Sequence, residues 1–304
     1  MQCDACRREP VVYQPYSGKH LCRSHFFVDF ETKAKHTIRS HGWLQPGNHI
    51  AAVLDGGALS AALLVFLAKL VANRRDVRLF AVTIDTGESG NPAPEQARTV
   101  AASCGVEWFC GSFVERYGTT LDEIVHQNGS DAAGRICRVL TNDFIGEIAE
   151  AHGATLGACA TAVDERACAF FSDLLSGTSE RTLFSSEVPG KTRIPLIRPF
   201  MGIPAPEVVL YAKLHRECAG CDVLPPPCGP DGDYCAPDAK AALDNYDRRH
   251  PAAKFALANL AQTLTGIAAR QEPPPVCPEC GEPVMGGGCE SCAIRRKFDR
   301  RALT

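Results

Sequence analysis

Two pairs of closely spaced cysteine or histidine residues lie at each end of the chain, and they restrict its possible folds more than any other feature. Near the start, Cys3 and Cys6 precede Cys22 and His25. A C-x-x-C turn holds two thiolates on one side of a knuckle, and a second pair completes a tetrahedron around zinc. A segment of roughly 30 residues cannot build a large core, so a metal would replace it. The spacing predicts a zinc finger, with a metal-free packed knuckle as the alternative.

The C-terminal end repeats this arrangement with four cysteines. The predicted zinc ligands are Cys277, Cys280, Cys289 and Cys292. A short glycine-rich loop separates the two pairs, which is typical of a closed, structural zinc ribbon. Residues 271–275 contain a proline run and read as a linker. The basic segment 295–301 follows, and it either binds phosphates or is a solvated terminus.

The cysteine pattern and the lack of long apolar runs indicate a cytoplasmic protein. The chain has 16 cysteines in 304 residues. Paired spacings near the ends favour metal binding over disulfides. No apolar run approaches the roughly 20 residues that a bilayer span needs, and no secretory leader is recognisable. We therefore expect a cytoplasmic location and no membrane partner.

The charge balance limits how the chain could contact nucleic acid. The formal net charge is -3, so any such contact must come from local basic patches. One candidate patch follows the first knuckle and contains Lys33, Lys35, His36 and Arg39. A solvated helix face is the alternative interpretation.

Between the two ends, apolar strand-like runs alternate with helical segments. We expect strands at 49–54, 77–84, 106–110 and 154–160, and helices at 60–72, 94–104, 121–127, 139–152 and 163–175. This order predicts an α/β fold with a doubly wound parallel sheet. The predicted division is an N-terminal zinc-finger module at 1–42, an α/β domain at 43–270, and a zinc ribbon with a basic tail at 271–304.

The segment between the first strand and the first helix of this domain has chemical significance. It reads Asp55-Gly56-Gly57-Ala58-Leu59-Ser60. Ligands of doubly wound sheets bind at the carboxyl ends of the strands. Paired glycines let the backbone approach an anion, and the next helix offers free N–H groups to phosphate. A plain tight turn is the alternative.

Read together, these pieces resemble the tRNA 2-thiolation (thiouridine synthetase) family of PP-loop ATP pyrophosphatases. The knuckle continues as Pro-Tyr-Ser-Gly and Leu-Cys-Arg-Ser-His-Phe, like the family's zinc-finger opening. The Gly-Gly loop resembles its PP-loop, and Ile-Asp-Thr-Gly at 84–87 resembles the end of its second strand. Asp164-Glu165 resembles its acidic pair, and the segment 193–200 followed by Glu207 resembles its later strand and helix. The Cys-Pro-Glu-Cys-Gly-Glu-Pro ribbon closes a resemblance that covers nearly the whole chain.

The resemblance implies an activity and a set of cofactors. ATP would adenylate the C2 oxygen of a tRNA uridine, and a sulfur source would then displace AMP to leave 2-thiouridine. ATP and Mg²⁺ would bind at Asp55, Gly56, Gly57, Ser60, Asp85 and Asp164. The resemblance further implies a PP-loop (adenine nucleotide alpha hydrolase-like) sheet, tRNA as a partner and a homodimer. Sulfur would arrive either as sulfide or on a ubiquitin-like sulfur-carrier protein.

Departures from the family pattern support an alternative function. The family loop reads Ser-Gly-Gly-Lys-Asp-Ser, so this chain lacks the phosphate-binding lysine and has Ala58 and Leu59 in the middle. Asp55 would place negative charge beside the phosphates. Ala160-Thr161-Ala162 replaces the family's Gly-His-Asn. The alternative is a catalytically inactive paralogue that binds tRNA or a sulfur carrier as a scaffold.

The resemblance also implies a [4Fe-4S] cluster held by three cysteines, and here too the pattern is incomplete. Cys137 and Cys228 match two of these catalytic cysteines, but Gly134 stands in the place of the third. Cys218, Cys221 and Cys235 lie near Cys228 in sequence, so a rearranged zinc or iron–sulfur site and a set of free thiols both stay open. Other cysteines on apolar stretches are interpreted as core residues, namely Cys104, Cys110, Cys159 and Cys168.

Overall fold

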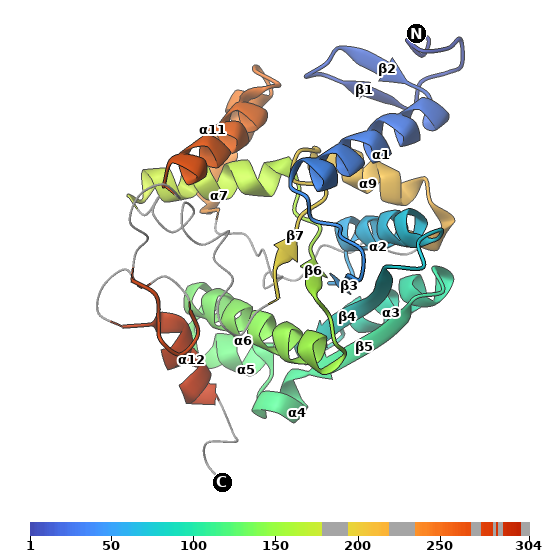
Figure 1. Cartoon of the computed structure of the whole chain (residues 1–304). Coiled ribbons are helices and arrows are strands. Elements are labelled where there is room, and N and C mark those ends of the chain that lie inside the picture. The colour runs from blue at the N-terminus through green and yellow to red at the C-terminus, as the bar shows by residue number, and fades with distance from the viewer. Residues whose placement is uncertain (178–193, 219–234, 269–274, 282–283, 285–287, 299–304) are drawn as a thin grey trace.

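The computed structural model describes residues 1–177, 194–218, 235–268, 275–281, 284 and 288–298. Its centre is a five-stranded parallel sheet with the order β5-β4-β3-β6-β7 (Figure 1). The strands are β3 (His49–Val53), β4 (Arg78–Asp85), β5 (Glu107–Ser112), β6 (Leu156–Ala158) and β7 (Leu196–Ile197). The chain order reverses beside β3, where β4 lies on one side and β6 on the other. This confirms the predicted doubly wound sheet and puts a switch point at the carboxyl end of β3.

Helices cover both faces of the sheet because alternate residues of the central strands point to opposite sides (Figure 1). Ile50 and Ala52 pack with α2 (Ala58–Val71) and α3 (Ala93–Ser103). Ala51 and Val53 pack against the other layer, where α6 (Ser130–Ala151) lies. The short helices α4 (Phe113–Tyr117) and α5 (Leu121–Asn128) extend this second layer. The strands are therefore apolar on both faces, as buried parallel strands are.

One helix differs in length from its prediction. The helix expected at 139–152 begins at Ser130. Its first turns contain Gly134, which lowers intrinsic helix propensity. Burial decides the outcome, because Ala133 and Ile136 pack against Phe113 and Ile124 of the preceding helices. Tertiary packing thus outweighs a weak local signal.

The N-terminal module shares its core with the sheet domain. The hairpin of β1 (Val12–Gln14) and β2 (Lys19–Leu21) leads into α1 (Arg23–Ser40). Phe26 and Phe30 of α1 are fully buried in the main core. The ring of Phe30 stacks on Tyr211 at 4.1 Å, on α9 (Ala205–Lys213). This packing fixes the module against the body.

A buried carboxylate strengthens this attachment. Glu207 of α9 is 4% exposed. It accepts hydrogen bonds from the Tyr16 hydroxyl at 2.6 Å and the Gln14 side-chain amide at 3.1 Å, and the Lys33 ammonium lies 3.6 Å away. Burial raises the pKa of Glu207. Lys33 pairs with Asp29 and Glu207, and Lys35 pairs with Glu31, so His36 and Arg39 are the most exposed members of the predicted basic patch.

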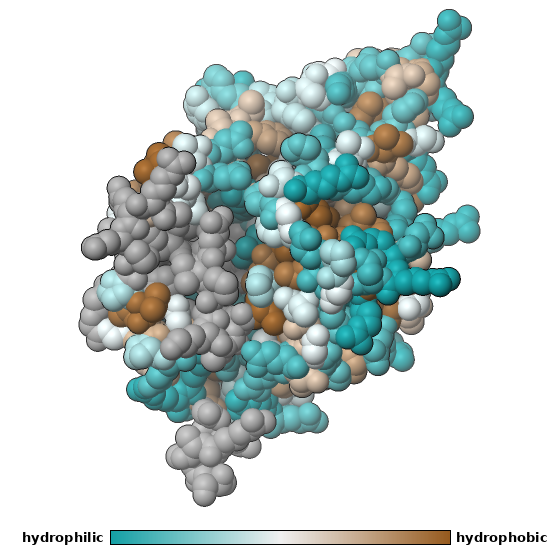
Figure 2. All heavy atoms as spheres, viewed as in Figure 1, coloured by the Kyte–Doolittle hydropathy of each residue, from teal (hydrophilic) through white to brown (hydrophobic). Residues whose placement is uncertain are grey.

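The remaining helices lie at the carboxyl end of the sheet and beside it. The helices α7 (Val163–Leu175), α10 (Pro237–Asp247) and α11 (Ala253–Ala268) pack together, and a short helical turn η1 (Arg216–Cys218) follows α9. The last helix, α12 (Glu290–Phe298), lies against α6 (Figure 1). Hydrophilic residues predominate on the face shown in Figure 2, and hydrophobic ones show in separate groups. None of the described helices is long and apolar enough to cross a bilayer.

Candidate nucleotide and metal sites

The N-terminal residues predicted as metal ligands converge in space. The ligand atoms of Cys3, Cys6, Cys22 and His25 lie within 4.8 Å of one another. The turn before β1 supplies Cys3 and Cys6, and Cys22 precedes the first turn of α1, which carries His25. The Cys6 and Cys22 sulfurs are 3.6 Å apart, and the Cys3 sulfur is 3.4 Å from His25 Nδ1. Ligands about 2.3 Å from a tetrahedral zinc would be about 3.7 Å apart. The arrangement therefore fits a tetrahedral metal.

The four C-terminal cysteines converge in the same way. Their sulfurs lie within 4.8 Å of one another, with Cys277 and Cys292 3.6 Å apart and Cys280 and Cys289 3.4 Å apart. Backbone N–H groups at Cys280 and Glu279 lower the pKa of Cys277 to about 7. A thiol with a lowered pKa supplies the thiolate that a metal needs.

The helix after this site is docked on the body and is not a free tail. Ile294 and Phe298 pack against the cluster of α5 and α6. Arg295, 17% exposed, lies with its Nε 3.0 Å from an Asp143 oxygen. Both interpretations of the basic segment were therefore wrong for Arg295, which holds α12 to α6. Arg300 and Arg301 lie outside the described residues.

The loop between β3 and α2 is closed by its own acidic residue. Asp55 Oδ1 accepts a hydrogen bond from the Gly57 N–H at 2.8 Å and another from the Ser60 hydroxyl. Gly56 has φ +81°, and a Cβ there would lie 2.5 Å from the Cα of Ala93. The loop needs glycine at this point because it bends in the left-handed region against the start of α3.

Asp85 ends the neighbouring strand β4, and its side chain turns back on its own loop. It accepts a hydrogen bond from the Gly87 N–H at 2.9 Å. Because β3 and β4 are parallel neighbours, Asp55 and Asp85 lie at the carboxyl ends of adjacent strands, at the same edge of the sheet. The predicted nucleotide loop thus has one carboxylate within it and a second at the end of the next strand.

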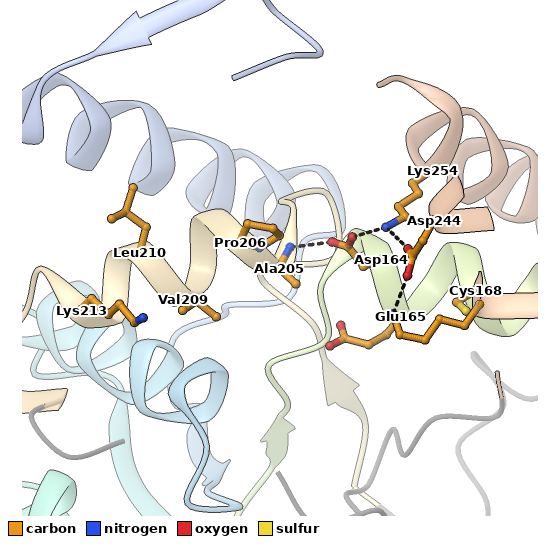
Figure 3. Close-up of a pocket in the computed structure, with 11 residues that line it drawn as sticks. Asp164, Glu165, Cys168, Ala205, Pro206, Val209, Leu210, Lys213, Asp244 and Lys254 are labelled. Carbon is orange, nitrogen blue, oxygen red and sulfur yellow. Dashed lines mark hydrogen bonds and ion pairs between the residues drawn. The ribbon is translucent and has the colours of Figure 1, made fainter. Parts of the chain in front are cut away.

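Asp164, the third aspartate predicted for the nucleotide site, connects three helices (Figure 3). It lies at the start of α7 and accepts the N–H of Ala205, the first residue of α9, at 2.6 Å. Its other oxygen is 2.8 Å from the ammonium of Lys254 on α11. An acidic side chain at the first N–H of a helix satisfies an otherwise unpaired donor and favours the helix dipole. Asp164 therefore has a structural role in this arrangement.

Lys254 is a site residue that sequence reasoning missed. Its side chain is 13% exposed and also pairs with Asp244 at 2.7 Å. Burial lowers the pKa of Lys254, but hydrogen bonds to Asp164 and Asp244 outweigh this and raise it to about 12. No spacing in the sequence could have indicated the pair, because Lys254 and Asp164 are 90 residues apart.

A cavity of about 730 Å³ lies between α7, α9, α10 and α11 (Figure 3). Asp164, Glu165 and Lys254 stand at one part of its wall, and Val209 and Leu210 make an apolar part. Its lining does not include Asp55, Gly56, Gly57, Ser60 or Asp85. Among the described residues, the predicted nucleotide site is therefore divided between the loop edge and this cavity.

The cysteines predicted for a cluster are only partly described. Cys137 is buried on α6 and is disulfide-bonded, so in this state it is not available as a metal ligand. Cys221 and Cys228 lie outside the described residues. Cys168 of α7 and Cys235 before α10 form a disulfide across 67 residues. Cys168 is thus buried as predicted, but as half of a disulfide, and in this state Cys235 is not available as a metal ligand.

Comparisons with known proteins agree with this architecture over the whole chain. Residues 2–27 match the model of the N-terminal LIM domain of 2-thiouridine synthetase TtuA. The cytoplasmic tRNA 2-thiolation protein 1 of Bos taurus is 27% identical over 98% of this chain and 88% of its own length. The tRNA-5-methyluridine(54) 2-sulfurtransferase of Thermus thermophilus is 26% identical over 100% of this chain and 95% of its own.

A solved structure gives the same result for the fold. The U34-tRNA thiolase NcsA from Methanococcus maripaludis, solved with its [4Fe-4S] cluster, superposes with a TM-score of 0.79 at 21% identity, covering 98% of this chain and 97% of that chain. The matches run from the first metal site through the sheet to the last metal site. The chain is therefore similar over nearly its whole length to the tRNA 2-thiolation proteins.

Proposed function

We propose that the chain is an ATP-dependent tRNA 2-thiouridine sulfurtransferase-like protein of the cytoplasm. The observation that carries the proposal is the end-to-end agreement with tRNA 2-thiolation proteins, which includes both terminal ligand sets and the parallel sheet between them. In the proposed reaction the C2 oxygen of a uridine attacks the α-phosphorus of ATP and pyrophosphate leaves. Sulfide then adds at C2, and AMP leaves with the former C2 oxygen.

The chain's own residues would divide this work between the loop edge and the metal sites. Backbone N–H groups after Gly56 would face phosphate oxygens, and Asp85 would hold Mg²⁺. The two terminal sites would hold structural zinc, because each has four converging protein ligands. Four protein ligands fill the tetrahedron and leave no position for water or a substrate. Of the two cysteines matched to the family's cluster motif, Cys137 is disulfide-bonded and Cys228 lies outside the described residues, and Gly134 lacks a thiol, so we assign no step to a cluster.

A second candidate function rests on the chemistry of the loop. Asp55 occupies the N–H of Gly57, and the loop has no lysine. These features favour a scaffold that binds tRNA, or a ubiquitin-like sulfur carrier, without using ATP. As a homodimer, such a scaffold would present two copies of each surface.

The two candidates differ in their products. Pure protein is incubated anaerobically with ATP, Mg²⁺, sulfide and unmodified tRNA, and the tRNA nucleosides are then analysed by mass spectrometry. The proposed activity yields 2-thiouridine with AMP and pyrophosphate in equal amounts. Binding of tRNA in a gel-shift assay without either product would support the scaffold. Absence of both tRNA binding and products would contradict the sulfurtransferase and the tRNA-binding scaffold, and would leave only a scaffold for a sulfur carrier.

A further inference from the structure

The loop between β3 and α2 already contains an anion. One oxygen of the Asp55 carboxylate accepts both the Gly57 N–H and the Ser60 hydroxyl. The Asp55 N–H in turn lies 3.3 Å from the Ser60 oxygen. Gly57 is the N-cap of α2, and no side chain caps α2 through the usual N-cap contact. The carboxylate thus takes the position at a helix start that favours negative charge.

The loop has little freedom to move away from this carboxylate. Gly56 lies against Ala93 at the start of α3, so closely that even a methyl group would clash. Ser60 is 3% exposed, and its hydroxyl oxygen also lies 3.1 Å from the Gly57 carbonyl oxygen, so its one proton is shared between this carbonyl and Asp55. The backbone path is therefore held by packing on one side and by hydrogen bonds on the other.

No cation of the loop or of α2 offsets this charge. Residues 55–60 contain no lysine or arginine. The only basic residue of α2 is Lys69 in its last turn, where it pairs with Glu31. A polyphosphate at the loop would meet a fixed negative charge and would compete with it for the same N–H group.

We propose that Asp55 is an internal occupant of the loop's anion site and sets its selectivity against nucleoside triphosphates. ATP with Mg²⁺ enters only when the carboxylate gives up the Gly57 N–H. The inference rests on the proposed function, because that function makes this loop the nucleotide loop. It assigns to Asp55 a specificity-determining role that the glycines alone do not have.

Two substitutions separate the charge of Asp55 from its hydrogen bonds. Asp55→Ser removes the charge and opens the Gly57 N–H. Asp55→Asn removes the charge but keeps an oxygen that can accept the same two hydrogen bonds. Asp122→Ser is the matched control, since the Asp122 carboxylate also accepts a backbone N–H, that of Ser89 at 3.2 Å, and Asp122 is not among the predicted nucleotide residues.

The measurement is the affinity for ATP with Mg²⁺ by isothermal titration calorimetry, with thermal unfolding as a check of folding. We expect Asp55→Ser to bind ATP at least about tenfold more tightly than the natural sequence. Asp55→Asn should gain less, because its side chain still holds the N–H. Asp122→Ser should show no gain, because its carboxylate does not accept an N–H of the loop between β3 and α2.

Three results would overturn the inference. They are equal ATP affinity in the natural chain and Asp55→Ser, no ATP binding by the natural chain, Asp55→Ser or Asp55→Asn, and a gain in Asp122→Ser equal to that in Asp55→Ser. A gel shift with tRNA on the same proteins tests the proposed function separately. Absence of tRNA binding by the natural chain and by every variant, together with a gain of ATP binding in Asp55→Ser, would refute the proposed function and keep the role of Asp55.

Discussion

The terminal metal sites and the central loop are built in opposite ways. Each terminal site brings four ligand atoms within 4.8 Å, and every ligand belongs to a pair only three residues apart. The central loop depends on three elements, since β3, α2 and the start of α3 all shape it. Two ligands three residues apart are brought together by a single local turn of the chain. The loop depends instead on the packing of three elements, and one acidic residue in it decides which anion the loop holds.

The largest expected effect is loss of a terminal metal. Cys22→Ser should remove one of about two bound zinc ions and loosen α1, whose Phe26 and Phe30 lie in the main core. The loss should be a large part of the roughly 10 kcal/mol with which structural zinc binds. Elemental analysis and thermal unfolding measure both effects.

Cys277→Ser should also remove one zinc but should cost less stability. Its site contacts the body mainly through α12, so the sheet domain keeps its core. Cys104→Ser is the control, because this half-buried thiol belongs to neither ligand set. If Cys22→Ser kept about two zinc ions per chain, Cys22 would not be a zinc ligand. The contrast between locally formed metal sites at the ends and the loop between β3 and α2 would then fail.

An intermediate effect is expected at the ion pairs of the cavity wall. Lys254→Met leaves Asp164 and Asp244 without their shared cation and should lower the free energy of unfolding by about 1–3 kcal/mol near neutral pH. The control is Lys240→Met, because Lys240 is 53% exposed and pairs with Asp244 at 3.2 Å. Exposed pairs contribute about 0.5 kcal/mol. Urea denaturation that gives equal losses for the two variants would contradict the structural role of Asp164.

The pH dependence of this difference has a defined sign. The folded-state pKa of Lys254 is raised from 10.5 to about 12. The ammonium therefore contributes fully below pH 10.5, and its contribution falls as the pH rises through about 12. The difference between the natural chain and Lys254→Met should shrink across this window and stay constant between pH 6 and 9.

The smallest expected effect on stability is at Gly134. A Cβ at Gly134 meets no atom within 4 Å, and residue 134 shares a helix face with Cys137. Gly134→Cys should stabilise α6 by about 0.5 kcal/mol and increase iron uptake during anaerobic, reducing reconstitution. Gly134→Ser gives the same side-chain size without a thiolate. Equal iron content in the two variants would mean that the missing cysteine is not what limits cluster binding.

Several features of the fold could be predicted from local pattern. The helix at 163–175 has the predicted bounds, and the order of strands and helices is confirmed. The start of α6 was predicted at 139 but lies at Ser130, because Gly134 and the polar residues of the first turn weaken the helical pattern there. Side-chain partners were the hardest to predict, as the Cys168–Cys235 disulfide illustrates, because residues 67 positions apart leave no periodic trace.

The sequence alone determined the two ligand sets, the alternation of strands and helices, and the glycines of the loop. These features depend on spacings of a few residues, which the backbone converts directly into geometry. Only the tertiary structure decided that Asp55 binds its own loop, that Asp164 joins α9 to Lys254, and that Glu207 anchors the N-terminal module. Each of these contacts depends on how distant elements pack, and packing is a property of the whole chain.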